Sequence, residues 1–127
     1  VLTWSVSGVQ QRSLLDLLRG WGQDGLHGHL QQLQCAYAKR CRYLLAACER
    51  HLGGLCRWSA PRFGMFVWLE VLGCASTSSI AEDLITSYGV AMVPGDAFCT
   101  SEGASGSSAS FFRVSFSLLT EETADLA

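Results

Sequence analysis

Charged side chains are scarce in this sequence. They make up 16% of the 127 residues, against 49% for hydrophobic residues, and the formal net charge is −2. Without an excess of positive charge, the chain has no general field that would attract nucleic acid or an anionic membrane surface. No apolar run approaches the roughly 20 residues that a membrane-spanning helix needs. We therefore expect no nucleic-acid partner and no membrane segment, and the apolar surplus indicates a piece that buries surface against another part.

Targeting signals are also missing. The chain opens at Val1 without a methionine, a basic stretch or a signal-peptide pattern. Its last predicted helix is too short to be stable alone. We expect one domain over residues 1–127 with both ends cut, from a cytoplasmic protein, with a mitochondrial location left open. In such a reducing compartment, the six cysteines are expected to be buried or partly buried free thiols: Cys35, Cys41, Cys48, Cys56, Cys74 and Cys99.

Two helices are predicted in the first half of the chain. The clearer one covers residues 26–52, where apolar residues recur at spacings of three and four and Gly53-Gly54 follows as a stop. Its stripe consists of Leu26, Leu30, Leu33, Tyr37, Cys41, Leu44, Cys48 and Leu52. A shorter helix is expected over residues 10–21, with its leucines turned inward: Leu14, Leu15, Leu17 and Leu18.

Three buried strands are predicted in the second half, at residues 65–71, 90–93 and 111–117, after a connector at 56–61. A capping box, Ser79-Ile80-Ala81-Glu82, predicts the start of a helix that stops at Gly89. Residues 99–110 are rich in serine and glycine and predict a mobile loop. Thr120-Glu121-Glu122 indicates a further helix start. The fold class is therefore α/β, a three-stranded sheet packed by helices, one of them long.

Arg113 is the most informative residue, because it stands in the apolar, strand-like run Phe111-Phe112-Arg113-Val114-Ser115-Phe116-Ser117. A charge in such a run is costly unless it meets an anion, and arginine grips a carboxylate with two parallel hydrogen bonds. The alternative is an arginine that faces solvent from an edge strand. Residues 64–70, GMFVWLE, and residues 89–98, GVAMVPGDAF, precede Arg113 in the chain.

That order of segments resembles the C-terminal part of pyridoxal-phosphate-dependent aminotransferases of class I and II, closest to the kynurenine, alpha-aminoadipate and aromatic amino acid group. Trp21-Gly22-Gln23-Asp24-Gly25-Leu26 and the helix segment from Tyr37 to Arg42 extend the resemblance over almost the whole chain. The resemblance implies the C-terminal small domain of a homodimeric transferase that moves an amino group from an aromatic or aminoadipate-like amino acid to a 2-oxo acid.

By the same resemblance, Arg113 binds the substrate α-carboxylate, and Phe98 and Phe66 line the pocket for the substrate side chain. Phe66 and Phe98 could equally be ordinary core residues. Phe63 and Asp96 depart from the family pattern, which has small or neutral residues there, and Phe63 is expected to narrow the pocket. The sequence offers no catalytic, cofactor-binding or metal-binding residue of its own.

The family's cofactor, pyridoxal 5′-phosphate, is implied to be held mainly by the part of the protein upstream of Val1, including the lysine that forms the Schiff base. Lys39 is the only lysine here, and it lies beside Arg40 on the polar side of the long helix, where a solvated role is expected. The chain is therefore expected to be inactive alone. Two alternatives stay open: an aminotransferase-like sensor behind a DNA-binding domain, and a degenerate relative that only binds.

Overall fold

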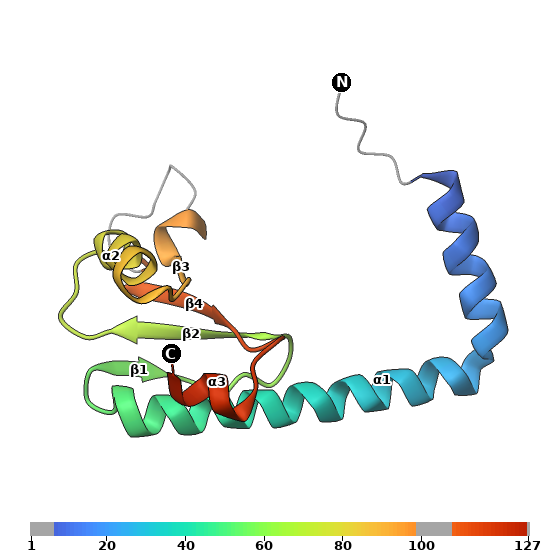
Figure 1. Ribbon diagram of the computed structural model, residues 1–127, viewed down its shortest axis with the longest axis horizontal. Helices are drawn as coiled ribbons and strands as arrows, with labels where there is room; N and C mark the ends of the chain where they lie inside the picture. The colour runs from blue at the N-terminus through green and yellow to red at the C-terminus, as the bar shows by residue number, and fades with distance from the viewer. Residues whose placement is uncertain (1–6, 99–107, 127) are drawn as a thin grey trace. The chain divides into compact units, whose positions relative to one another are not determined.

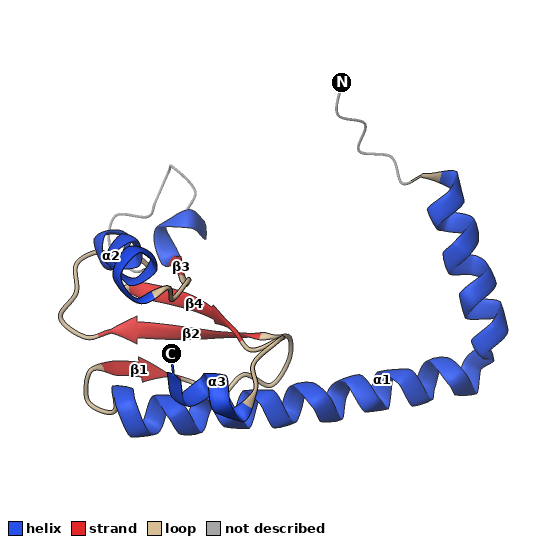
Figure 2. Cartoon of the chain, viewed as in Figure 1, coloured by secondary structure: helices blue, strands red, loops and turns tan. Residues whose placement is uncertain are grey.

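The computed structural model describes residues 7–98 and 108–126, and these residues form two compact units, residues 1–36 and residues 37–127. Helix α1 (Gly8–Leu52) runs through both units. The other elements all lie in the second unit (Figures 1 and 2). They are β1 (Cys56–Trp58), β2 (Phe66–Val71), α2 (Ser78–Tyr88), β3 (Val93–Pro94), the 3-10 helix η1 (Gly95–Phe98), β4 (Phe111–Ser115) and α3 (Glu121–Leu126).

The sheet has four strands in the order β1-β2-β4-β3, and every neighbouring pair is antiparallel. The prediction of three strands was therefore wrong by one: residues 56–58 of the expected connector pair with residues 69–71 of β2. The strand predicted at 90–93 is only Val93–Pro94 in the structure, while the strands predicted at 65–71 and 111–117 are confirmed as β2 and β4.

The core lies on one face of the sheet. Val67 and Leu69 of β2 and Phe112 of β4 are buried there together with Phe116. Leu44 and Cys48 of α1 and Ala81 of α2 pack against them, so both helices cover this same face. Burying a side chain such as Leu69 contributes about 1.5–3 kcal/mol, so this layer supplies much of the unit's stability.

The predicted apolar stripe on α1 divides at the boundary between the units. Its later members pack on the core as predicted, namely Tyr37, Cys41, Leu44, Cys48 and Leu52. Its earlier members, Leu26, Leu30 and Leu33, are exposed, as are all four leucines expected to turn inward between residues 14 and 18. The break predicted between the two helices is confined to Gly22, whose φ of +61° and ψ of −171° interrupt an otherwise continuous helix.

The start of α2 differs from the predicted capping box. The residue before the helix is Thr77, which is fully buried, and its side chain does not cap the helix. Its hydroxyl instead donates toward the carbonyls of Phe111, at 2.8 Å, and Ala109, at 3.1 Å. The helix ends as predicted at Gly89, which takes the left-handed conformation with φ of +68°. Thr120 accepts a hydrogen bond from the Thr123 amide, which confirms the predicted start of α3.

Candidate functional site

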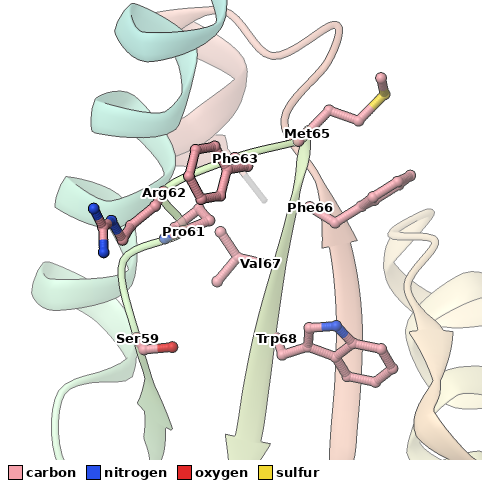
Figure 3. A pocket seen from close by; sticks show the side chains of 9 residues that line it. Ser59, Pro61, Arg62, Phe63, Met65, Phe66, Val67 and Trp68 are labelled. Atoms are coloured by element: carbon pink, nitrogen blue, oxygen red, sulfur yellow. The ribbon is translucent and has the colours of Figure 1, made fainter.

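The face of the sheet opposite the core carries aromatic side chains, the cation Arg113, and the ion pair of Arg57 with Glu70, whose charged atoms lie 3.5 Å apart. Alternation along β2 turns Phe66 and Trp68 away from buried Val67, as the side chains in Figure 3 show. Arg113 lies directly opposite Trp68 in the pairing of β2 with β4. Phe66 and Trp68 are 37% and 40% exposed, so this face is open enough to receive a ligand or another part of the protein.

Arg113 brings the three predicted site residues together. Its guanidinium carbon lies 4.3 Å from the ring centre of Phe66 and 4.3 Å from the ring centre of Phe98. These distances are within the range of a cation–π contact, which uses the negative face of the ring. Phe66 comes from β2 and Phe98 from η1, so the fold joins residues 32 positions apart around one charge.

The Nε atom of Arg113 is buried and has no hydrogen-bond partner among the residues that the structure describes. A buried donor without a partner costs about 1–3 kcal/mol, so it marks a place where the folded chain is not at its most stable. Such orphan groups in a native structure call for a specific explanation, and an acceptor that arrives with a ligand is one. The guanidinium fork is shaped for two parallel bonds to a carboxylate.

Trp68 belongs to this group of residues, although sequence reasoning did not select it. Its ring lies 5.3 Å from Phe98 and 6.3 Å from Phe111, both edge-on. The signal that could have found it is the two-residue period of the strand, which puts Trp68 on the same face as Phe66. We call Phe66, Trp68, Phe98 and Arg113 the aromatic–arginine cluster.

A hollow of about 390 Å³ lies beside this cluster, between β2 and the segment before it (Figure 3). Phe66 and Trp68 line it, together with Ser59, Pro61, Arg62, Phe63, Gly64, Met65 and Val67, but Arg113 does not. Phe63 is 85% exposed and its ring lies 5.8 Å from the Arg62 guanidinium. Phe63 therefore stands at the rim of the hollow rather than in the core.

Asp96, the other departure noted in the sequence, makes two side-chain hydrogen bonds. The hydroxyls of Ser76 and Ser78 both donate to its Oδ2 atom, at 3.0 and 2.9 Å. These bonds connect η1 to the start of α2. Residues 99–107, most of the predicted mobile loop and the place of Cys99, lie outside the described residues.

The basic side chains of the long helix have different surroundings. Lys39 is exposed, and its Nζ lies 5.6 Å from the Tyr43 ring. Arg40, which was expected beside Lys39 on the polar side of the helix, is instead half-buried and donates to the backbone carbonyl of Ser117. The described residues contain no group of three or more His, Cys, Asp or Glu side chains placed to hold a metal ion.

The cysteines of the described residues are free thiols. Cys48 is buried, and Cys41, Cys56 and Cys74 are half-buried, as expected, but Cys35 is exposed. Burial raises the pKa of Cys41, Cys48 and Cys56, which keeps these thiols protonated and unreactive near neutral pH. None of the described helices is long and apolar enough to cross a membrane.

Comparison with known proteins decides the family. The model of the family described as aminotransferase class I and II matches residues 2–127, nearly the whole chain. The chain belongs to this family. The resemblance drawn from the motifs is thereby confirmed, and the sheet with its covering helices is the aminotransferase α/β fold.

Among curated aminotransferases, the chain is 35% identical to the mitochondrial kynurenine/alpha-aminoadipate aminotransferase of Mus musculus, over 94% of this chain and 27% of that protein. It is 37% identical to the aminotransferase tdiD of Emericella nidulans, over 95% of this chain and 27% of that one. This member of the family thus spans about a quarter of the length of the curated relatives that it matches.

Among solved aminotransferases, the chain resembles the alpha-aminoadipate aminotransferase LysN of Thermus thermophilus, crystallised with N-(5′-phosphopyridoxyl)-L-leucine. The TM-score is 0.71 at 26% identity, and the match covers 87% of this chain and 26% of that one. The aminotransferase Aro9 of C. albicans matches 99% of this chain and 29% of its own with a TM-score of 0.81, and at 22% identity it supports the fold alone.

Proposed function

We propose that this chain is the C-terminal small domain of a pyridoxal-phosphate-dependent aminotransferase that takes an amino group from an aromatic or aminoadipate-like amino acid and gives it to a 2-oxo acid. The observation that carries the proposal is the buried, unpartnered Nε of Arg113 next to two aromatic rings. The family membership and the names of the relatives support the reaction and the substrate class.

In this proposal, Arg113 binds the substrate α-carboxylate. Two parallel hydrogen bonds fix the position and the angle of a carboxylate, and a carboxylate is common to both amino acid and 2-oxo acid substrates. Contact with the Phe66 and Phe98 rings restricts the guanidinium before the substrate arrives. Less side-chain freedom is then lost on binding, which favours affinity.

Phe66 and Phe98 also offer apolar surface to the substrate side chain in this proposal. Both are partly exposed and both contact Arg113, so a substrate whose carboxylate meets Arg113 has aromatic surface at hand. An aromatic side chain or the methylene chain of aminoadipate gains from burying area there. Trp68 widens the same surface through its contact with Phe98.

The described residues do not fit covalent attachment of pyridoxal phosphate. A Schiff-base lysine needs a lowered pKa, which a desolvated setting provides, and Lys39 is exposed. We infer that the cofactor is bound mainly by the larger remainder of the whole protein, that this chain alone does not catalyse transamination, and that the intact enzyme is a homodimer. A cytoplasmic or mitochondrial location belongs to the same proposal. The chain's own contribution is to hold and orient the substrate.

The proposal is tested by substrate binding in the whole aminotransferase that carries this chain. Arg113→Ala is expected to weaken binding of an amino acid substrate far more than binding of pyridoxal phosphate, followed through the absorbance of the cofactor. Arg42→Ala is the matched control, because Arg42 is an exposed arginine of α1 that lies outside the cluster and does not line the hollow. Equal losses of substrate and cofactor affinity in Arg113→Ala would contradict the assigned role.

A further inference from the structure

We propose that Asp96 is a positioning residue, which ties η1 to the start of α2 and thereby holds the Phe98 ring against the Arg113 guanidinium. Asp96 itself touches neither Arg113 nor a substrate in this proposal. The consequence for substrate binding rests on the function proposed above. The mechanical consequence, the placement of Phe98, does not rest on it and can be measured separately.

The strand pairing that leads into η1 is short. β3, which leads into η1, pairs with β4 through Val93 and Pro94 only. A four-residue 3-10 helix has poor internal hydrogen-bond geometry and little stability of its own. Phe98 is the last residue of η1 and is 44% exposed, so its contacts with Arg113 and Trp68 hold only part of its ring.

Gly95 fixes one end of η1. It is buried and packs against the backbone of Ser108, where an added Cβ would clash with the carbonyl oxygen. This close approach sets the path of the chain as it leaves β3. Asp96 is the first of the three residues that follow Gly95 in η1.

Asp96 restrains η1 through two hydrogen bonds that its carboxylate oxygen Oδ2 accepts. Its Oδ2 accepts from the Ser76 hydroxyl at 3.0 Å and from the Ser78 hydroxyl at 2.9 Å. The Ser76 hydroxyl also accepts from the Ser78 amide at 3.3 Å, so the two serines are held in one turn. Bonds to a charged acceptor are the stronger kind, worth about 1.5–3 kcal/mol each where they are shielded and less at an exposed site.

The serines are themselves anchored to the strand that carries Arg113. Thr77 lies between them, is fully buried, and donates its hydroxyl to the Phe111 and Ala109 carbonyls. The Thr77 amide also donates to the Ala109 carbonyl, at 2.8 Å. Asp96 therefore connects η1, through this turn, to the first residue of β4. Phe98 of η1 is therefore linked through this turn to β4, the strand that carries Arg113. This link holds the Phe98 ring near the Arg113 guanidinium.

The placement of Phe98 is tested in the full chain by NMR of the arginine side chains. The Nε–H of Arg113 lies near two ring faces, so ring currents shift its resonance away from those of exposed arginines, and Arg113→Lys identifies the signal by removing it. In Asp96→Ala, this resonance is expected to move toward the exposed arginines. Its hydrogen exchange should quicken by about 2- to 10-fold, the factor for losing one net hydrogen bond.

Two further variants separate positioning from general damage. Asp96→Asn keeps an oxygen that can accept from both serines, so the Arg113 resonance should stay near its parent position. The double variant Ser76→Ala/Ser78→Ala removes the donors and should reproduce Asp96→Ala, which keeps the test available if Asp96→Ala fails to fold. Asp83→Ala is the control, an exposed carboxylate on α2 outside this turn. An unchanged Arg113 resonance in the double variant would overturn the proposal.

The link to function is read from kinetics of the whole aminotransferase. Asp96→Ala should raise the KM for the amino acid severalfold with a smaller change in kcat, and Asp96→Asn should restore the parent KM. If the Arg113 resonance moves and the KM does not, the positioning role stands and the carboxylate-binding role of Arg113 falls. If neither moves, the positioning role falls.

Discussion

Replacing Arg113 by methionine should leave the chain about as stable as the parent or more stable, although Arg113 sits in the middle of a strand. The expectation follows from the buried Nε without a partner and from the two ring contacts. A residue kept for binding rather than for folding has this signature, because its best partner arrives only with the ligand.

The magnitude comes from three opposing contributions. Removing the orphaned Nε recovers about 1–3 kcal/mol. Losing two cation–π contacts at a partly open site costs about 0.5–1 kcal/mol each, and a methionine sulfur against the same rings returns about 0.3–1.5 kcal/mol in all. The free energy of unfolding of Arg113→Met should therefore lie within about 1 kcal/mol of the parent value or above it.

The assay is urea denaturation of the full chain, followed by far-ultraviolet circular dichroism. Leu69→Ala is the comparison, because Leu69 pairs with Phe112 on the same two strands but points into the core. It should lose about 2–5 kcal/mol. If Arg113→Met loses as much as Leu69→Ala, then Arg113 is a structural residue and the reasoning from its orphaned nitrogen is refuted.

Four further outcomes are expected. Thr77→Val should lower the free energy of unfolding in urea by about 1–3 kcal/mol, since it leaves two carbonyls without their hydroxyl, and Thr77→Ser should not. Gly95→Ala should destabilise the chain and move the Phe98 ring away from Arg113, because the new Cβ would meet the Ser108 carbonyl. Thermal denaturation measures the loss of stability, and the Arg113 Nε resonance reports the displacement of the ring. The raised thiol pKa values mean that the unfolded chain loses these protons first, so the measured stability should fall as pH rises above the ordinary thiol value of 9.0. At neutral pH, iodoacetamide should label exposed Cys35 well before buried Cys48.

Periodicity predicted the parts of the fold in which a residue's partner lies within the chain. The stripe from Tyr37 to Leu52 packs on the sheet as its spacing predicts. Leu26 and Leu33 continue the same pattern but are exposed. A repeat shows that one face of a helix is apolar, but it does not show which part of the protein covers that face. The strand at β1 was missed because three residues are too few to show an alternation.

The start of α2 shows how a tertiary contact can overrule a local signal. The sequence offers Ser79 with Glu82, a good capping pair, yet the helix begins one residue earlier behind Thr77. The Thr77 hydroxyl is committed to the carbonyls of Ala109 and Phe111, some thirty positions away, and no local pattern contains that information.

The candidate site was predictable where one residue type was out of place and unpredictable where the fold assembled it. Arg113 stands out in an apolar run, and Phe98 and Phe66 followed from the family motifs. The two-residue period places Trp68 on the same face as Phe66, but its position opposite Arg113 required the register between β2 and β4. The bonds of Asp96 required the approach of η1 to the start of α2, which pairs residues 18 and 20 positions apart.

The central claim is that Arg113 binds the carboxylate of an amino acid substrate, and the most direct measurement is the kcat/KM of Arg113→Lys in the whole aminotransferase. An ammonium keeps the charge but cannot form the two parallel bonds of the guanidinium. The account predicts a loss of about 10- to 100-fold, the equivalent of about 1.5–3 kcal/mol, with the affinity for pyridoxal phosphate unchanged. An Arg113→Lys enzyme with the parent kcat/KM would contradict it.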